Sequence, residues 1–323
     1  MQAKVFVTRI IPDAGLEPVR AACAADVWDD RLPAPYDTLI ERVRGVDGIL
    51  CSITERIDAN LIEAAGPQLK VISQMAVGYD NIDVAAAQAR GIAVGHTPGV
   101  LTEATADLTL ALLLAAARRI PESVEYIRKG EWRTWEPQTL LGHDLAGKTL
   151  GIVGLGRIGK AVAKRAAGFE LRLIAHGPRL TDAEAAAVGA VRVDLPTLLR
   201  EADFVSLHTP LTPETRHLIN PTTLAQMKPT AILVNTTRGP VVDQTALYDA
   251  LTNGVISGAA LDVTDPEPLP ADDPLLTLPN VVIVPHIGSA TVGTRNQMAR
   301  IAADNLIAGV NDQPLPHAVP AQI

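Results

Sequence analysis

The chain contains 323 residues, of which 47% are hydrophobic and 3% are aromatic, and its formal net charge at pH 7 is −8. This composition excludes a disordered or fibrous protein, because it supplies enough apolar side chains for buried cores. The acidic balance argues against nucleic acid and against an anionic membrane surface as partners. A chain of this length suits two domains of ~150 residues each.

Short apolar runs alternate with stretches of helical pattern in the first third of the chain. The strands expected there are Lys4–Thr8, Gly48–Cys51, Leu69–Gln74 and Ile92–Val94. The expected helices are roughly Asp13–Ala24, Tyr36–Arg44, Ala59–Ala65, Val84–Arg90 and a longer one from Thr102 to near Arg119. Such alternation is typical of α/β architecture with parallel strands.

A second alternating series follows, and it is bounded by a final helix. Its expected strands are Thr149–Val153, Leu171–His176, Val191–Val193, Phe204–His208, Ala231–Asn235, Ser257–Asp262 and Val281–Pro285. The final helix is expected at about Ala290–Ala308. The two series predict an α/β protein with two doubly wound, Rossmann-like parallel sheets.

The cysteines and the apolar runs bear on the cell compartment. Cys23 and Cys51 lie in apolar segments and neither is part of a CxxC pair, so we expect buried thiols in a reducing compartment. No basic and apolar leader precedes Lys4–Thr8. The longest apolar run, Leu108–Ala117, is shorter than the ~20 residues that a membrane span needs. We therefore expect a cytoplasmic protein without a membrane segment.

A glycine motif, GxGxxG, follows the expected strand Thr149–Val153 and opens a helical run at Arg157–Ala167. This context is the one that a dinucleotide-binding loop requires. Gly154 allows the tight turn, Gly156 lets the backbone approach a pyrophosphate, and Gly159 lets helix and strand pack closely. The helix N-terminus adds N–H groups and a partial positive charge for the phosphates. A purely structural glycine turn is the alternative.

The end of the next expected strand indicates which dinucleotide is preferred. NAD sites usually have an acidic residue there, which binds the ribose 2′-hydroxyl. Here Gly177 occupies that position, so no carboxylate would repel a 2′-phosphate, and Arg179 and His176 could contact one. The sequence therefore predicts a preference for NADP(H), with NAD(H) still possible. The alternative is that Arg179 is a solvated surface residue.

Three polar residues follow expected strands of the second series, at the edge where doubly wound sheets bind ligands. Arg238 could bind a carboxylate with its planar fork, and His286 can exchange a proton near neutral pH. Glu267 beside His286 would fix its tautomer and favour the imidazolium. Taken singly, each has a structural alternative: an ion pair, an exposed loop acid and a hydrogen-bonded core histidine. The other histidines lack metal-ligand spacing, so we expect no metal.

These residues lie in sequence blocks that resemble the D-isomer-specific 2-hydroxyacid dehydrogenase family, most strongly its glyoxylate/hydroxypyruvate reductase type. The blocks are Val71–Gly78, Gly151–Gly159, Val234–Gly239, Leu261–Pro270 and Pro285–Thr291. The resemblance implies reduction of a small 2-oxo acid to the D-2-hydroxy acid by hydride transfer. Arg238, Glu267 and His286 match the catalytic set of the family, with His286 as the proton donor.

The resemblance also implies further contacts. Arg238, His286 and the backbone N–H groups of Val77 and Gly78 would bind the substrate. Besides the motif glycines, Gly177 and Arg179, the cofactor contacts would be Thr105, Leu155, Arg157, Ile158, Pro210, Thr236, Asp262 and Gly288. Structural alternatives are a core threonine at Thr105, a loop-capping acid at Asp262 and a strand-end turn at Pro210. In a homodimer, Trp135 would reach the substrate site of the partner subunit; the alternative is local packing beside Trp132.

No Ser/Gly-rich linker separates the two series, so we expect the domain junctions near Gly99–Thr102 and near Ser289. The last helix would then return to the first domain. The predicted domains are a discontinuous substrate domain, 1–99 plus 291–323, and an inserted NAD(P)-binding domain, 100–290. The first domain would clamp substrate against the second.

Other members of the family and one different class of protein remain as alternatives. Phosphoglycerate dehydrogenases often have an added regulatory domain, for which this chain lacks the length, and formate dehydrogenases have a Gln near Val284–His286. A phosphite-oxidising relative is possible, although the block Leu261–Pro270 favours the hydroxypyruvate type. A dinucleotide-sensing corepressor of the same fold is the alternative outside the enzymes. The sequence leaves open the preferred 2-oxo acid and the physiological direction.

Overall fold

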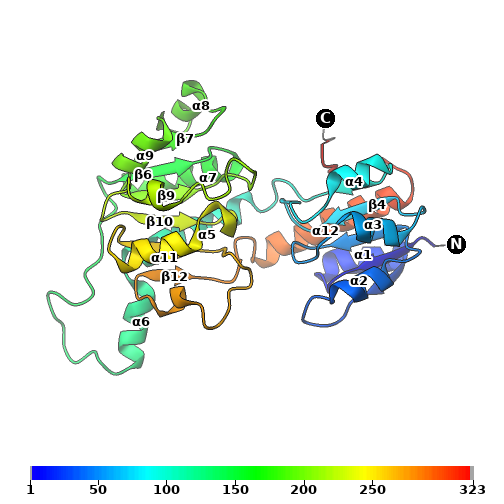
Figure 1. Ribbon diagram of the computed structural model, residues 1–323, viewed down its shortest axis with the longest axis horizontal. Helices are drawn as coiled ribbons and strands as arrows, with labels where there is room; N and C mark the ends of the chain where they lie inside the picture. The colour runs from blue at the N-terminus through cyan, green and yellow to red at the C-terminus, as the bar shows by residue number, and fades with distance from the viewer. Residues whose placement is uncertain (1, 321–323) are drawn as a thin grey trace. The chain divides into compact units, whose positions relative to one another are not determined.

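The computed structural model describes residues 2–320, and the chain in it divides into two compact units (Figure 1). The first unit consists of Met1–Leu101 and Ala290–Ile323, and the second consists of Thr102–Ser289. Among the described residues, no helix is both long and apolar enough to cross a membrane.

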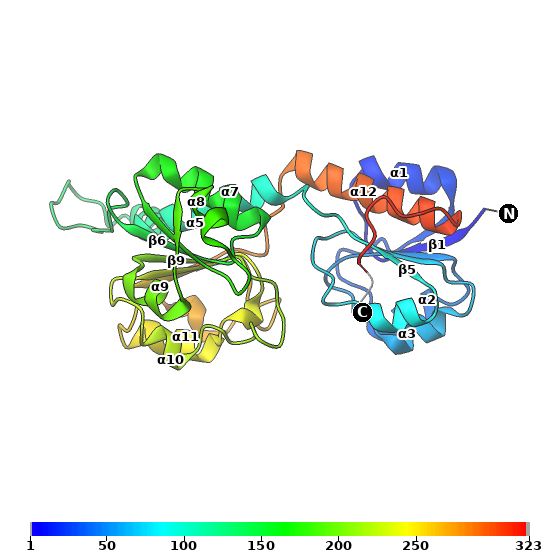
Figure 2. The same ribbon diagram turned by 90° about the horizontal axis from the view of Figure 1, so that it is seen from above.

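The first unit is a parallel sheet between two helical layers. Its strands are β1 (Lys4–Val7), β2 (Ala24–Val27), β3 (Gly48–Cys51), β4 (Val71–Gln74) and β5 (Ala93–Gly95), in the order β2-β1-β3-β4-β5. One face is covered by α1 (Asp13–Ala22) and α12 (Val292–Val310), and the other by α2 (Tyr36–Arg42), α3 (Ala59–Ala65) and α4 (Val84–Ala89) (Figure 2). The free thiols of Cys23 and Cys51 are buried in this unit, as predicted, and burial raises the pKa of both.

The second unit is a larger parallel sheet of the same kind. Its strands are β6 (Thr149–Val153), β7 (Arg172–His176), β8 (Ala190–Arg192), β9 (Phe204–Leu207), β10 (Ile232–Asn235), β11 (Gly258–Leu261) and β12 (Val281–Ile283), in the order β12-β11-β10-β9-β6-β7-β8. The central strands β6, β9 and β10 are buried throughout, because helices cover both faces of the sheet.

The helices of the second unit form two layers. One face is covered by α5 (Thr102–Ala117), α7 (Arg157–Ala166) and α8 (Asp182–Ala186), and the other by α9 (Leu195–Glu201), α10 (Pro221–Leu224) and α11 (Gln244–Thr252) (Figure 2). Short 3₁₀ turns occur at Ala167–Phe169, Gly239–Val241 and Pro274–Thr277. The predicted fold class, two parallel doubly wound sheets, is confirmed.

The sequence predicted neither strand β2 nor helix α6 (Ile120–Arg128). Strand β2, with the sequence AADV, is an edge strand with no fully buried residue, so it lacks a strong apolar pattern. Because β2 begins at Ala24, α1 ends at Ala22 and is shorter than the predicted helix. Helix α6 has no buried residue; its apolar residues Ile120, Val124 and Ile127 have helical spacing but are exposed.

The strand order places the chemically important loops of the second unit along one edge. All its strand pairs are parallel, so the carboxyl ends of the strands lie together. After β6 the chain continues to β7 and β8 on one side, whereas β9 returns to the other side of β6. The topological switch point therefore lies between β6 and β9, where sheets of this type bind ligands.

Candidate active site

The glycine loop lies at this switch point. Gly154 has a φ of +96°, and a Cβ there would lie 2.7 Å from the carbonyl carbon of His208, at the end of β9. A Cβ at Gly159 would lie 2.2 Å from the carbonyl oxygen of Gly154. Both glycines are therefore required by the packing of β6, α7 and the β9 loop itself.

Gly156 is different, because a Cβ there would meet no atom of the chain within 4 Å. It is the N-cap of α7. In many helices the N-cap side chain accepts a hydrogen bond from a free N–H group of the first turn, and glycine has no side chain to do so. An open cradle in front of unsatisfied helix N–H groups fits the pyrophosphate of a dinucleotide. Leu155 is buried in the core, so only its backbone faces the loop, and Ile158 packs partly against the same core. Arg157 is exposed.

The end of β7 has no acidic residue. The carbonyl oxygen of His176 accepts a hydrogen bond from Gly154 N at 2.8 Å, which brings the β7 end against the glycine loop. Gly177 follows directly, and Arg179 is exposed in the turn before α8. The next carboxylates along the chain already have partners. Asp182 forms an ion pair with Arg192, and Glu184 contacts Thr181 and Lys160.

His286 and Glu267 form a hydrogen-bonded pair. The Nδ1 atom of His286, in the loop after β12, lies 2.5 Å from Oε1 of Glu267, in the loop after β11. The His286 side chain is 26% exposed and that of Glu267 is 36% exposed. The pairing leaves Nε2 as the ring nitrogen that can face a substrate. Two of the three predicted catalytic side chains are thus brought together although they are 19 residues apart.

A buried carboxylate orients the His286 loop. His286 has a φ of +51°, a left-handed conformation that costs a non-glycine residue about 1–3 kcal/mol. Asp262, which is 2% exposed, accepts hydrogen bonds from Ile287 N at 2.6 Å and from Gly288 N at 2.9 Å. Its carbonyl oxygen accepts a third from His286 N at 2.9 Å. Burial raises the pKa of the Asp262 carboxyl, against the effect of these N–H donors. In the structure, Asp262 therefore caps the loop that contains His286, which is the structural role that the sequence analysis gave as its alternative.

Three further predicted cofactor contacts, Thr105, Thr236 and Pro210, lie on α5, after β10 and after β9. Thr105 is buried in α5 and donates to the carbonyl oxygen of Gly288 at 3.2 Å. The hydroxyls of Thr109 and Thr236 lie 3.0 Å apart. Pro210 is exposed after β9, and its carbonyl oxygen accepts from Thr215 at 2.6 Å.

Arg238 lies in a tightly bound turn after β10. The side chain of Asn235, the last residue of β10, donates to Arg238 O at 2.9 Å and accepts from Thr237 N at 3.0 Å. A Cβ at Gly239 would lie only 1.8 Å from Thr264 O, so glycine lets this turn approach the loop after β11. The sequence analysis missed Asn235, whose signal is a buried amide at the end of an apolar strand.

The other predicted substrate contacts lie elsewhere. Val77 and Gly78 follow β4 in the first unit, and both are partly buried. Trp132 and Trp135 follow α6 and are 63% and 80% exposed, so neither packs into the core of its own unit. No group of three or more His, Cys, Asp or Glu side chains in the described part of the chain is placed to bind a metal ion.

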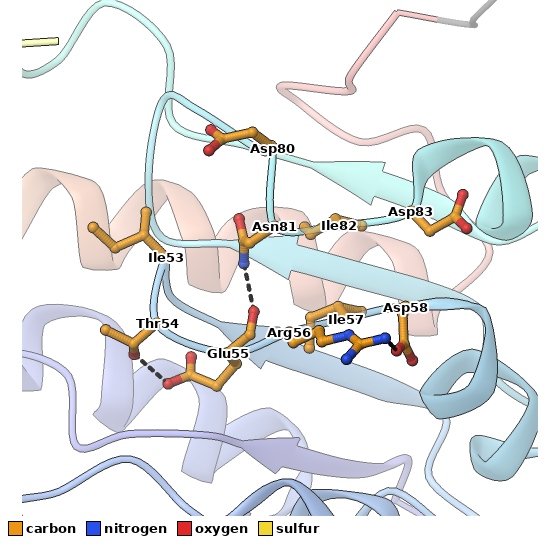
Figure 3. A pocket seen from close by; sticks show the side chains of 10 residues that line it. All are labelled: Ile53, Thr54, Glu55, Arg56, Ile57, Asp58, Asp80, Asn81, Ile82 and Asp83. Carbon is orange, nitrogen blue, oxygen red and sulfur yellow. Dashed lines mark hydrogen bonds and ion pairs between the residues drawn. The ribbon is translucent and has the colours of Figure 1, made fainter. Parts of the chain in front are cut away.

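Two cavities lie outside these loops. One, of about 480 Å³, opens in the first unit between residues 53–58 and 80–83, and Figure 3 shows Asn81 directed across it toward Glu55. The other, of about 230 Å³, lies in the second unit at the amino ends of β10–β12, where His143 Nε2 is 3.0 Å from Ser257 Oγ. None of the predicted site residues lines either cavity.

A doubly wound sheet with an open glycine cradle at its switch point and a His–Glu pair on the same edge defines a nucleotide-dependent dehydrogenase class. The model of the "D-isomer specific 2-hydroxyacid dehydrogenase, NAD binding domain" matches residues 110–288. A glyoxylate reductase of Korarchaeum cryptofilum is 51% identical over 100% of this chain and 97% of its own length. The human glyoxylate reductase/hydroxypyruvate reductase is 46% identical over 97% of this chain and 96% of its own. The chain belongs to the D-isomer specific 2-hydroxyacid dehydrogenase family.

Solved structures agree with this membership. The TT0316 protein from Thermus thermophilus is 50% identical, with a TM-score of 0.91 over 98% of this chain and 100% of that one. An NADPH-dependent glyoxylate/hydroxypyruvate reductase from Sinorhizobium meliloti, in complex with NADP and malonate, is 33% identical. Its TM-score is 0.86 over 99% of this chain and 97% of that one.

Proposed function

We propose that the protein is an NADP(H)-preferring glyoxylate/hydroxypyruvate reductase that converts a small 2-oxo acid into the D-2-hydroxy acid. The observation that carries this proposal is the His286–Glu267 hydrogen bond of 2.5 Å on the sheet edge that also bears the open glycine cradle. The names of the relatives that are 46–51% identical support the substrate class.

In the proposed reaction, His286 donates a proton from Nε2 to the carbonyl oxygen of the substrate. The hydride that the carbonyl carbon needs would come from a reduced nicotinamide when that cofactor is bound. Glu267 accepts a hydrogen bond from Nδ1–H of the charged ring and orients the ring, while the Nδ1 proton stays on His286. Arg238 binds the substrate carboxylate and stabilises charge that develops on the oxygen. The N–H groups of Val77 and Gly78 bind the same carboxylate.

The second unit would be the NAD(P)-binding domain and the first the substrate domain. The motif glycines, with the backbone of Leu155, Arg157 and Ile158, would bind the pyrophosphate. The remaining proposed cofactor contacts are Thr105, Gly177, Arg179, Pro210, Thr236, Asp262 and Gly288. Preference for NADP(H) is supported by the absence of a carboxylate after β7 and by the exposed Arg179. A related enzyme, the Sinorhizobium reductase, is NADPH-dependent.

A steady-state panel of small 2-oxo acids, each run with NADPH and with NADH, tests the proposal. We expect turnover of glyoxylate and hydroxypyruvate, with a higher kcat/KM for NADPH than for NADH. Equal or better efficiency with NADH would overturn the cofactor preference alone. No turnover of any 2-oxo acid with either cofactor would overturn the reductase and favour the dinucleotide-sensing corepressor.

We further propose a homodimer in which Trp135 reaches the substrate site of the partner subunit. The support is the set of exposed apolar side chains on and after α6, which are Ile120, Val124, Ile127, Trp132, Trp135 and Leu141. Side chains of this kind are enriched where a surface is covered by a partner. The free, buried thiols of Cys23 and Cys51 support a cytoplasmic location.

A further inference from the structure

Three consecutive carbonyl groups in the loop after β4 are each bound from within the first unit. Ala76 O accepts from Thr97 N at 2.8 Å, and Gly78 O accepts from Gln74 Nε2 at 3.2 Å. Between them, Val77 O lies 2.9 Å from Nδ1 of His96. A carbonyl oxygen can only accept, so His96 has its proton on Nδ1 in this bond.

The bound carbonyls fix the direction of the N–H groups that follow them. In a trans peptide the C=O and the next N–H are rigidly coplanar and point in opposite directions. The N–H groups of Val77, Gly78 and Tyr79 therefore point away from Thr97, His96 and Gln74. Within the described residues of this unit, none of these three N–H groups donates to an acceptor. Free backbone N–H groups of this kind can donate hydrogen bonds to an anion.

The donor at Gln74 belongs to a buried network. Gln74 is fully buried, and its Nε2 also donates to Asn81 Oδ1 at 2.7 Å, while its Oε1 accepts from Cys51 Sγ at 3.1 Å. Asn81 Nδ2 donates to Ser52 O at 2.9 Å and to Glu55 O at 2.8 Å, and Figure 3 shows the latter bond beside the cavity. Gln74 is thus required by the fold, which makes it a poor position for a test.

His96 is a better position, because its backbone is fixed independently of its ring. Its N–H donates to His317 O at 3.0 Å, and its carbonyl oxygen accepts from Asn305 Nδ2 at 3.0 Å. The ring meets Tyr79 edge-on, with centroids 5.5 Å apart and an interplanar angle of 84°. A change of the imidazole therefore removes the bond to Val77 O and leaves both backbone bonds of residue 96.

We propose that His96 is a positioning residue for substrate binding, whose Nδ1–H fixes Val77 O and so aims the Gly78 N–H at the substrate carboxylate. His96 does not itself touch the substrate in this proposal. The inference rests on the proposed function, because that function supplies the carboxylate. Nothing in the sequence motifs marks His96, which is 19 residues from Val77 and precedes a proline-containing turn.

The test compares four proteins: wild type, His96→Leu, His96→Asn and His317→Leu. Leucine removes the donor, whereas the asparagine amide can place an N–H near the position of Nδ1. His317→Leu removes a partly buried imidazole from the adjoining segment without removing the bond to Val77 O. Two measurements are made on each protein: the KM and kcat for glyoxylate with NADPH, and the dissociation constant of oxalate by calorimetry.

We expect His96→Leu to raise both the KM for glyoxylate and the dissociation constant for oxalate by about fivefold to tenfold, the worth of one hydrogen bond. Its kcat and its KM for NADPH should change by less than about twofold. His96→Asn should recover most of the loss, and His317→Leu should behave as wild type. A general loss of structure would instead lower kcat and the melting temperature, and asparagine would not rescue it selectively.

The outcomes separate this proposal from the proposed function. If wild type turns over glyoxylate but His96→Leu keeps the wild-type KM and oxalate affinity, the positioning role is overturned and the reductase stands. If oxalate binding weakens in His96→Leu but no 2-oxo acid is reduced, the reductase fails and the positioning role stands. If wild type does not bind oxalate, the positioning role is overturned.

Discussion

His286 is oriented by two carboxylates that act in different ways. Glu267 binds the ring at Nδ1, and Asp262 binds the backbone N–H groups that follow the residue. The ring contact determines which nitrogen faces outward, whereas the backbone contacts stabilise a left-handed conformation that a histidine rarely adopts. Together the two contacts fix the tautomer and the position of the ring, so that Nε2–H can be directed at the atom that it protonates.

His286→Gln tests the proton donor. The amide is close in size but cannot transfer a proton, so kcat for glyoxylate should fall by about 10²–10⁴-fold. The dissociation constant for NADPH, measured by fluorescence titration, should stay within about twofold of wild type. His143→Gln, at the opposite edge of the same sheet, is the matched control and should keep wild-type kcat. Turnover close to wild type in His286→Gln would remove this residue from the reaction.

The burial of His208, at the end of β9, should make the free energy of unfolding depend on pH. Burial lowers the pKa of its imidazole from 6.5 to about 4. Below pH 6.5 the unfolded chain therefore takes up a proton at His208 that the folded chain does not, and stability is lost as the pH falls toward 4. The loss from this residue should be about 2 kcal/mol between pH 7 and pH 5.

Urea unfolding of wild type and His208→Gln at pH 7 and pH 5 checks this. Glutamine does not titrate, so the variant should lack this part of the pH dependence while it can still hydrogen-bond to Ser206, which lies 2.8 Å from His208 Nε2. An identical change of the free energy of unfolding with pH in both proteins would contradict the expectation.

At the scale of elements, the glycines at the junction of β6 and α7 are of two kinds: two are required by packing, and one leaves space that a ligand can occupy. Gly154 and Gly159 are enclosed by their own chain, so their lack of a side chain is a packing requirement. Gly156 faces open space, so the fold alone would accept a methyl group there. A single motif thus contains residues that serve two different purposes.

Two alanine substitutions should separate these purposes. Gly156→Ala should change the free energy of unfolding by less than about 1 kcal/mol. The added methyl group meets no atom, and the preference for Gly over Ala at an N-cap is partly offset because Ala has less conformational freedom in the unfolded chain. It should nevertheless abolish most of the rise in melting temperature that NADPH gives wild type, because the methyl group would occupy the approach of the pyrophosphate.

Gly159→Ala, in contrast, should lower the stability of the protein in the absence of ligand. Its Cβ would collide with Gly154 O, so we expect a loss of about 1–3 kcal/mol of stability before any NADPH is added. Gly168→Ala, where a Cβ meets nothing within 4 Å, is the control for a glycine replaced without contact. Equal effects of Gly156→Ala and Gly159→Ala on the apo protein would refute the distinction.

At the scale of the whole molecule, the exposed apolar side chains on α6 and on the segment after it are the surface at which we propose the dimer contact. Helix α6 has no buried residue, and apolar side chains continue along the segment as far as Leu141. The exposed Trp135 is part of this surface, so the proposed dimer and the proposed contact of Trp135 with the partner's substrate site are tested together.

We expect wild type to sediment with twice the mass of one chain and Ile127→Glu to sediment as a single chain, because a charge would be buried at the interface. Lys129→Glu, which adds acidic character at an exposed neighbouring position, should remain dimeric. Trp135→Ala should raise the KM for the 2-oxo acid. A wild-type protein that sediments as one chain at all concentrations would exclude the proposed dimer.

The amino-acid sequence by itself determined the parallel α/β fold class and the strand–glycine–helix loop at β6 and α7. Apolar periodicity and glycine spacing report on local environment, and the central strands of both sheets are short and buried, which such patterns mark well. The edge strand β2 was not predicted because its half-buried and exposed residues have no strong apolar pattern. Helix α6 was not predicted although Ile120, Val124 and Ile127 have helical spacing, because the predicted helix before it ended near Arg119.

Only the tertiary structure decided which polar groups meet. His286 pairs with Glu267, Asp262 binds the amides after His286, and His96 binds Val77 O, across 19 to 26 residues in each case. These partners lie in loops that follow different strands or precede different helices. Their proximity therefore depends on the order of strands in the sheet and on the backbone angles of each loop, and neither leaves a periodic trace in the sequence.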